Sequence, residues 1–223
     1  IGTRSYDLSA AGMIMGIVNV TPDSFSDGGH FQTADAAATR ALQLESEGAA
    51  IIDFGGESTR PGAAEVNAED EQQRVLPAIE KFASLRAPQT LISVDTSKPE
   101  VAAAALAAGA DIINDVNGFS NPAMRSVATG SKCGLVLMHM PGNPRTMQQS
   151  PHYDDVVAEV MTYLEQQLTL CEHDGIAPER IVLDPGIGFG KSLEHNLELL
   201  CSLPEMRVCG RPLLIGVSRK SFI

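Results

Sequence analysis

The sequence predicts an α/β protein of the (β/α)8 TIM-barrel class, apparently truncated after its seventh strand. Short apolar runs recur along the chain, and each is followed by a Gly-, Pro- or Ser-rich turn and a segment with helical periodicity. The runs are apolar throughout, which is typical of parallel strands covered on both faces. The length of 223 residues lies in the range of a single barrel, roughly 200 to 250 residues.

Seven strands are predicted, each ending just before or at a polar residue or a turn. They are Met13–Val18, Ala49–Phe54, Leu91–Val94, Asp111–Ile113, Leu135–Met138, Ile181–Leu183 and Leu213–Val217. Because the standard barrel has eight βα units, we expect one domain over residues 1–223 that lacks its C-terminal βα unit. A doubly wound open sheet is the alternative, since strand order cannot be derived from one sequence.

Helix-start signals lie between these runs. They are Thr33 before an Ala-rich stretch to Glu47, Asn67, Ser97 at capping-box spacing from Glu100, and Asn121 before Pro122. From Asp155 to Glu172, apolar residues recur at helical spacing, which predicts an amphipathic helix that packs on the sheet.

Composition and charge exclude several functional classes. The formal net charge of -12 repels nucleic-acid phosphates and anionic membranes, so we expect neither as a partner. No apolar run approaches the ~20 residues of a membrane span, and residues 1–4 form no signal peptide. The four cysteines contain no C-x-x-C pair, which favours reduced thiols. We therefore expect a cytoplasmic protein.

Polar residues at the ends of the predicted strands are the candidate site residues, because barrel active sites lie at the carboxyl ends of the strands. They are Asn19, Glu57, Asp95, Asn114, Asp115, His139, Asp184, Arg219 and Lys220. Asp95, Asn114 and Asp184 are expected to surround one hollow, with Lys220 beside them. Two carboxylates and an amide accept more hydrogen bonds than they donate, which suits a flat heterocycle with amino and ring N–H groups.

Two other interpretations of these three residues remain open. A hard divalent cation is one, although it would need more oxygen ligands on one side. The other is that each aspartate only caps the turn that follows its strand. His139 is interpreted as a hydrogen-bonded wall residue rather than as an acid or base.

Two long loops are expected to act as lids over the barrel mouth. They span residues 21–29 and 55–62, and each contains two or more glycines. The second contains Arg60 and two hydroxyl groups, and arginine with backbone N–H groups binds phosphate oxygens. Ordinary surface loops are the alternative.

Residues 184–192 approach two nucleotide-binding motifs without matching either. A Rossmann G-x-G-x-x-G motif would need glycine where Lys191 stands, and a phosphate-binding loop would need glycine where Pro185 stands. The glycines instead predict a tight turn that brings Phe189 close to a ligand, with Ser192 capping the next helix.

Seven motifs in collinear order resemble the dihydropteroate synthase family, and together they span nearly the whole chain. They are NVTPDSFSDGG from Asn19, GESTRPG ending at Gly62, SVDT from Ser93, NDV from Asn114, LMHM from Leu137, DPGIGFGK from Asp184 and SRKSF from Ser218. The resemblance implies a transferase of folate biosynthesis. It would condense 6-hydroxymethyl-7,8-dihydropterin diphosphate with 4-aminobenzoate, release diphosphate, use Mg²⁺, and be a target of sulfonamides. It also implies a homodimer for the full-length parent.

The resemblance also assigns roles to residues. The implied pterin ligands are Asp95, Asn114, Met138, Asp184 and Lys220. The implied aminobenzoate contacts are Pro61, Phe189, Lys220 and Ser221. The implied diphosphate contacts are Asn19, Thr59 and Arg60, with Asn19 also at the metal. The implied catalytic residues are Asp95, Arg60, Lys220 and Asp27.

Two other functions are compatible with an acidic pterin pocket, and one motif of the family is missing from the sequence. The rivals are a pterin-binding methyltransferase domain, which passes a methyl group from a reduced folate to a corrinoid protein, and a non-catalytic pterin-binding barrel. The family's last strand carries an Arg-x-His pair that holds diphosphate, and the sequence ends at Ile223 before it. We therefore expect the 223-residue chain itself to be weakly active or inactive.

Overall fold

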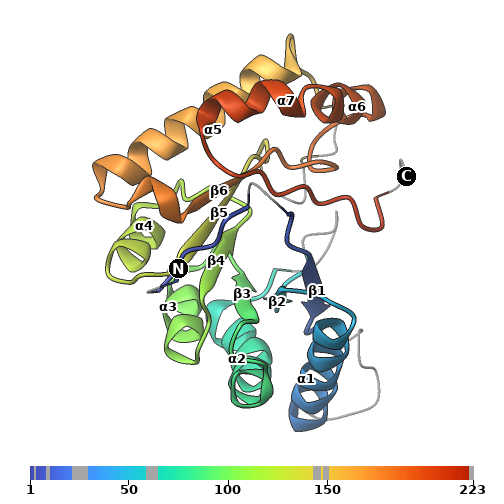
Figure 1. Cartoon of the computed structure of the whole chain (residues 1–223), viewed down its shortest axis with the longest axis vertical. Helices are drawn as coiled ribbons and strands as arrows, with labels where there is room; N and C mark the ends of the chain where they lie inside the picture. The colour runs from blue at the N-terminus through green and yellow to red at the C-terminus, as the bar shows by residue number, and fades with distance from the viewer. Residues whose placement is uncertain are drawn as a thin grey trace. The chain divides into compact units, whose positions relative to one another are not determined.

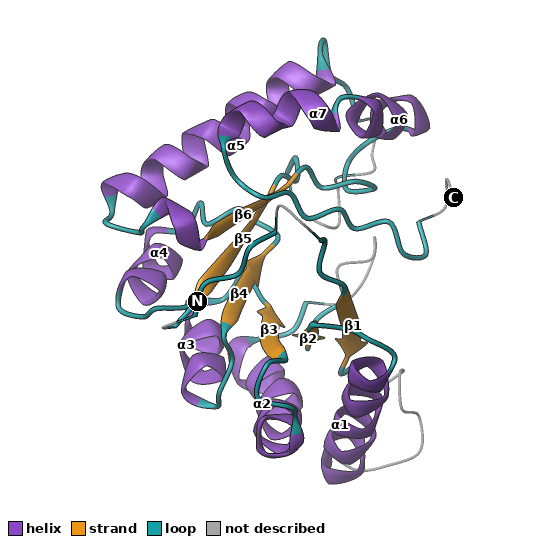
Figure 2. Cartoon of the chain, in the orientation of Figure 1, coloured by secondary structure: helices purple, strands orange, loops and turns teal. Residues whose placement is uncertain are grey.

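The computed structural model describes residues 1–2, 4–8, 11–21, 30–58, 65–142, 147 and 151–220. In this part of the chain, strands alternate with helices (Figures 1 and 2). Six strands form a sheet in the sequential order β1-β2-β3-β4-β5-β6. Sequential parallel order is that of a (β/α)8 barrel, whereas a doubly wound sheet reverses its order at a switch point. The TIM-barrel class is confirmed, and the doubly wound alternative is wrong.

The six strands overlap the first six predicted runs. They are β1 (Met15–Asn19), β2 (Ile51–Gly55), β3 (Leu91–Asp95), β4 (Ile112–Asp115), β5 (Gly134–Met138) and β6 (Ile181–Asp184). The seventh predicted strand, residues 213–217, is wrong as a regular strand. It forms one isolated parallel bridge, from Leu213 to Leu183. Two backbone hydrogen bonds make this bridge: Leu183 N donates to Pro212 O, and Leu214 N donates to Leu183 O.

Seven α-helices follow the strands in the described part of the chain. They are α1 (His30–Ser46), α2 (Ala68–Leu85), α3 (Pro99–Ala107), α4 (Pro122–Thr129), α5 (Val156–His173), α6 (Leu193–Cys201) and α7 (Leu203–Met206). Two short 3₁₀ helices, η2 (Pro178–Arg180) and η3 (Arg207–Cys209), accompany them. Asn67 and Ser192 cap α2 and α6 as predicted, each accepting a hydrogen bond from the backbone N–H three residues on.

Two predicted helix starts are wrong. Thr33 lies inside α1, which begins three residues earlier at His30. The Ser97–Glu100 capping box does not form, since Lys98 occupies the N-cap of α3 without a side-chain cap bond. Pro99 then takes the first helical position, where its fixed φ angle and missing N–H are tolerated.

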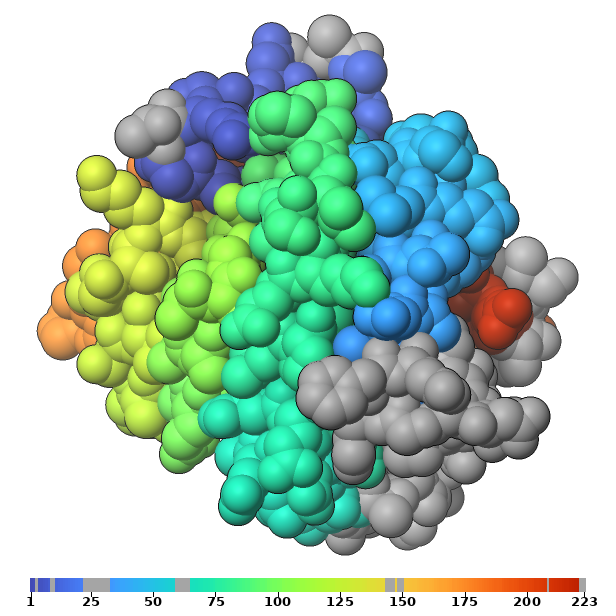
Figure 3. Space-filling view, turned by 90° about the horizontal axis from the view of Figure 1, so that it is seen from below, coloured from blue at the N-terminus to red at the C-terminus, as the bar shows by residue number. Residues whose placement is uncertain are grey.

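The chain divides into two compact units. The first contains residues 1–58, 64–114 and 130–134. Its core lies between the helices and one face of the strands, where Phe54, Ile92 and Val94 pack against Ile79 and Phe82. Figure 3 shows α1 in light blue beside α2 in teal on the surface. The side chains that alternate with this buried set point to the opposite face of the strands.

Within the described ranges, the second unit contains residues 115–129 and 135–220. Along α5, Val156, Val160 and Leu164 are buried at helical spacing, which confirms the predicted apolar stripe. A smaller cluster of Val116 with three methionines lies against Phe189. All four cysteines are free, as expected. None of the helices in the described ranges is long and apolar enough to cross a membrane.

Candidate functional site

Three predicted site residues of the first unit lie in one register row. Asn19 pairs with Gly55, Gly55 with Asp95, and Asp95 with Asn114. These residues stand at the carboxyl ends of four parallel strands, so their side chains share the face opposite the helices. A Cβ atom on Gly55 would lie 3.6 Å from Asp95 Oδ2 and 3.7 Å from Asn19 Oδ1, so these two oxygens flank the glycine.

A second carboxylate, Asp53, lies one pleat below this row. It is buried in the middle of β2, and its Oδ2 accepts a hydrogen bond of 3.1 Å from Asn114 Nδ2. Burial raises the pKa of Asp53, while the neighbouring Ser93 and Asn114 side chains oppose this rise. Asp53 therefore orients the Asn114 amide. Sequence reasoning missed it by counting it as part of an apolar run, although a carboxylate inside such a run is itself a signal.

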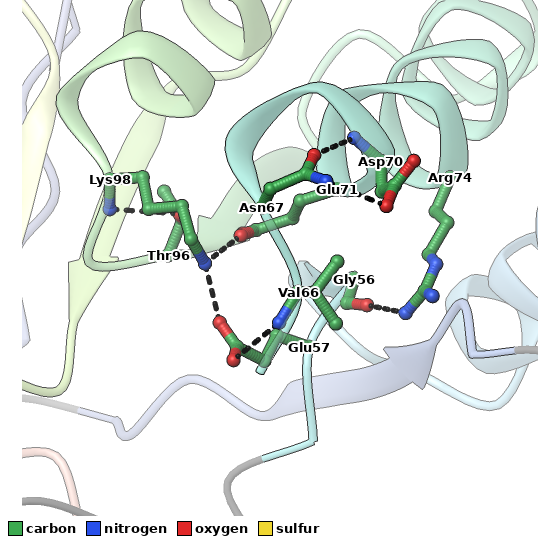
Figure 4. Close-up of polar contacts among 9 residues, drawn as sticks. All are labelled: Gly56, Glu57, Val66, Asn67, Asp70, Glu71, Arg74, Thr96 and Lys98. Atoms are coloured by element: carbon green, nitrogen blue, oxygen red, sulfur yellow. Dashed lines mark hydrogen bonds and ion pairs between the residues drawn. The ribbon is translucent and has the colours of Figure 1, made fainter. Parts of the chain in front are cut away.

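Lys98 connects the segments that follow β2 and β3 (Figure 4). Its Nζ lies 2.5 Å from Glu57 Oε2 and 2.5 Å from Glu71 Oε2, and Glu71 is almost fully buried. Glu57 Oε1 also accepts a 3.1 Å hydrogen bond from Val66 N. Burial lowers the pKa of Lys98, but the two carboxylates outweigh it, and the pKa is raised overall. Glu57, a strand-end candidate, thus belongs to a structural ion-pair cluster.

In the second unit, Met138 pairs in register with Asp184 at the ends of β5 and β6. Asp184 is buried, and its Oδ1 accepts a 2.7 Å hydrogen bond from Gly186 N. Burial raises the pKa of Asp184 to about 6, although the Gly186 N–H group and the charges of Lys191 and Lys220 oppose the rise. The Asp184 side chain therefore caps the turn after β6, which is one of the alternatives predicted from the sequence. It also lies near the positive charges of Lys191 and Lys220.

The predicted tight turn after β6 is confirmed. Gly186 and Gly188 have φ angles of 69° and 79°, and a Cβ atom on Gly186 would lie 1.8 Å from the His139 carbonyl oxygen. A Cβ atom on Gly188 would lie 2.7 Å from Lys220 Cδ. Lys220 Nζ stands 4.0 Å from the centroid of the Phe189 ring. The turn thus brings together two residues that the resemblance assigned to aminobenzoate.

Lys191 lies inside this turn and is only 4% exposed. Its Nζ donates to the carbonyl oxygens of Gly186 and Phe189, each at 3.0 Å, and lies 3.0 Å from His139 Nδ1. Burial lowers the pKa of Lys191 to about 7, and burial with the Lys191 charge lowers that of His139 to about 3. His139 is therefore the wall residue that the sequence predicted. The role of Lys191 was missed, because the sequence treated it only as a mismatch to a nucleotide motif.

Several predictions lie outside the described residues. These concern Asp27, Thr59, Arg60, Pro61 and Ser221, together with residues 22–29 of the first predicted lid loop and residues 59–62 of the second. Among the predicted residues that are described, Asn19, Asp95 and Asn114 belong to the first unit, whereas Met138, Asp184, Phe189 and Lys220 belong to the second. Each set is brought together within its own unit. The gathering of both sets around one hollow stays a prediction.

Comparisons with known proteins agree on one family. A profile described as "Pterin binding enzyme" matches residues 15–223. The chain is 52% identical to the dihydropteroate synthase of Escherichia coli (strain K12) over 219 residues, 98% of this chain and 77% of that protein. For the Synechocystis enzyme the identity is 46%, over 100% of this chain and 77% of that protein.

Solved structures give the same result. A Yersinia pestis dihydropteroate synthase in a sulfonamide drug complex superposes with a TM-score of 0.91 and 44% identity, covering 99% of this chain and 79% of that one. A Xanthomonas albilineans dihydropteroate synthase with 4-aminobenzoic acid has a TM-score of 0.87 and 48% identity, covering 94% and 74%.

Proposed function

The chain belongs to the pterin-binding enzymes, as a member of the dihydropteroate synthase family, and we propose that its two strand-end rows form the substrate site of that reaction. The reaction condenses 6-hydroxymethyl-7,8-dihydropterin diphosphate with 4-aminobenzoate. A C–N bond forms at the pterin methylene carbon, the C–O bond to diphosphate breaks, and the amine gives up one proton, so that 7,8-dihydropteroate and diphosphate are released. The observation that carries the assignment of residues is the register row of Asn19, Gly55, Asp95 and Asn114.

The pterin ring is proposed to bind to the polar ends of β3, β4 and β6. Asp95 and Asp184 supply acceptors for the amino group and the ring N–H groups, and Asn114 can both donate and accept. The Asn114 Nδ2 group donates a hydrogen bond to Asp53, so the Asn114 side-chain oxygen is the atom that would face the ligand. Lys220 supplies a donor, and Met138, in register with Asp184, supplies apolar contact.

The diphosphate is proposed to bind at Asn19, Thr59 and Arg60, with Mg²⁺ at Asn19. The donor set fits this ion, because an amide oxygen and a carboxylate oxygen flank Gly55, and Mg²⁺ favours a few protein oxygens together with waters and substrate phosphates. When bound, Mg²⁺ would neutralise charge on the departing diphosphate. Arg60 would stabilise the same anion through paired N–H donors.

The aminobenzoate is proposed to bind beside Phe189 and Lys220, with Pro61 and Ser221 at the same subsite. The Lys220 ammonium lies over the Phe189 ring, an arrangement that fixes both groups. Lys220 can then attract the benzoate carboxylate while the ring offers an apolar wall. We propose that diphosphate leaves before the amine attacks, so that positive charge develops on the pterin methylene, where Asp95 and Asp184 favour it. Asp27 is proposed as a further catalytic residue, and this role is supported only by the family resemblance.

Calorimetry with pterin diphosphate and then 4-aminobenzoate tests this function. Binding of 4-aminobenzoate only after pterin diphosphate has bound is the expected result. A pterin complex that is indifferent to aminobenzoate would favour the methyltransferase or the non-catalytic barrel. The homodimer and the Mg²⁺ requirement stay predictions that sedimentation and metal titration can test.

A further inference from the structure

The Lys191 side chain is buried in the second unit, and its ammonium group makes hydrogen bonds there. An ammonium group has three N–H donors and no acceptor, and three partners surround this one at 3.0 Å: Gly186 O, Phe189 O and His139 Nδ1. Nδ1 accepts from the ammonium when the neutral imidazole carries its hydrogen on Nε2. All three acceptors are neutral, and the side chain is only 4% exposed. Because every donor has an acceptor inside the protein, this lysine has none left to bind a phosphate, unlike the lysine of a phosphate-binding loop.

The three partners of Lys191 come from two segments of the chain: one follows β5, and the other two are the ends of the turn after β6. His139 follows β5 and is 52 residues away from Lys191. Gly186 and Phe189 are the first and fourth residues of a four-residue turn that also has a backbone bond from Phe189 N to Gly186 O. One side chain therefore ties the turn after β6 to the end of β5. It also fixes the Phe189 backbone, from which the ring extends to Lys220.

The geometry points to Lys191 as a positioning residue for the aminobenzoate subsite. Its ammonium holds residues 186–189 in the conformation that places the Phe189 ring beside Lys220, and it does so without touching either substrate. This inference rests on the proposed function only where it names aminobenzoate, because the internal contacts themselves do not depend on any ligand.

A purely space-filling role makes a different prediction. Methionine has nearly the length and volume of lysine, so Lys191→Met preserves packing but leaves three buried acceptors without their donor. If Lys191 donates to His139 Nδ1, the neutral imidazole must carry its hydrogen on Nε2. The Lys191→Met variant removes that constraint, so the two roles differ in a measurable property of His139.

The first test is ¹⁵N NMR of the histidine side chains. In the wild-type chain, His139 is expected in the Nε2–H form, and in Lys191→Met a substantial share is expected to shift to the Nδ1–H form. Lys81→Met is the matched control, because Lys81 is 43% exposed and pairs with Asp35 on the surface. His139 found in the Nδ1–H form in the wild-type chain overturns the inference, because the Lys191 ammonium could not then donate to Nδ1.

The second test is calorimetry of 4-aminobenzoate in the presence of pterin diphosphate. Lys191→Met is expected to weaken aminobenzoate binding about tenfold or more, which corresponds to roughly 1.4 kcal/mol, while pterin affinity changes much less. Equal losses for both ligands, or no loss for either, overturn the inference. If the wild-type chain binds neither ligand, the proposed function fails, and the NMR test still decides whether Lys191 donates to His139.

A wild-type measurement covers the case in which Lys191→Met does not fold. At pH 5.5 the Lys191 ammonium protons are expected to exchange with solvent far more slowly than those of Lys81, because the Lys191 group is buried and fully hydrogen-bonded. Exchange as fast as that of Lys81 overturns the inference.

Discussion

Lys98 in the first unit and Lys191 in the second are both largely buried, yet their pKa values shift in opposite directions. Lys98 Nζ lies 2.5 Å from carboxylate oxygens of both Glu57 and Glu71, and its pKa is raised. Lys191 has two carbonyl oxygens and an imidazole as hydrogen-bond partners, and its pKa is lowered to about 7. Burial opposes the charged form in both cases. At Lys98, two carboxylates in direct contact offset the effect of burial on the lysine pKa. At Lys191, the neutral hydrogen-bond partners offset that effect only in part.

The two lysines also join different parts of the fold. Lys98 ties the end of β2, through Glu57, to α2 and the start of α3, whereas Lys191 ties a single turn to the end of β5. Loss of Lys98 leaves a buried anion without its ion-pair partner, whereas loss of Lys191 releases a single turn. Loss of Lys98 is therefore expected to cost more stability than loss of Lys191.

The largest effect is expected for Lys98→Met. It leaves Glu71, whose side chain is 1% exposed, as a buried carboxylate without its ion-pair partner, and we expect the free energy of unfolding to fall by about 3 kcal/mol. Urea unfolding measures this change. Adding Glu71→Gln removes the orphaned charge and is expected to restore part of the loss. If the double variant is less stable than the single one, the charge-pair explanation is wrong.

The next effect concerns the turn that Lys191 holds. In Gly186→Ala, the new Cβ atom would lie 1.8 Å from the His139 carbonyl oxygen. Gly175→Ala is the matched control, because its φ angle of +85° is also positive but nothing lies within 4 Å of its Cβ position. We expect the control to lose about 1 kcal/mol through backbone strain and Gly186→Ala to lose about 1 kcal/mol more than the control. Equal losses in thermal unfolding would show that the close approach does not matter.

Asp184→Asn tests whether the second unit's carboxylate binds the pterin. The substitution replaces a charged acceptor with an amide that presents a misplaced donor, and we expect pterin affinity to fall by about 1 to 3 kcal/mol. Calorimetry measures the affinity. Asp154→Asn is the control, since the Asp154 side chain is 99% exposed. Unchanged affinity in Asp184→Asn would leave this aspartate with only its turn-capping role.

The smallest effect is a pH dependence of stability at His139. Its pKa falls from 6.5 to about 3 in the folded chain, so below pH 6.5 the unfolded chain binds more protons at this residue. The contribution to the free energy of unfolding is therefore lost as pH falls, by about 1.4 kcal/mol at pH 5.5. Comparison with His139→Gln isolates it from Asp184, whose raised pKa acts in the opposite direction. A constant difference between wild type and variant from pH 7 to 5 contradicts the buried neutral imidazole.

Part of the candidate site could be predicted from sequence because its signals are local. Asn19, Asp95 and Asn114 end apolar runs, and parallel pairing places strand ends in one row, so their common register follows from the fold class. The cap at Ser192 is also local, since it involves a backbone group three residues away. The family resemblance added the substrates, which no periodicity contains.

The sequence by itself determined the order of strands and helices, the polar strand ends and the glycine-rich turn, because each depends on residues within a few positions of one another. Only the tertiary structure decided what Asp53, Lys98 and Lys191 do. Their partners lie 61, 41 and 52 residues away at Asn114, Glu57 and His139. A buried charge is stable only beside the partner that compensates it, and chain folding, not sequence spacing, brings that partner within 3 Å or so.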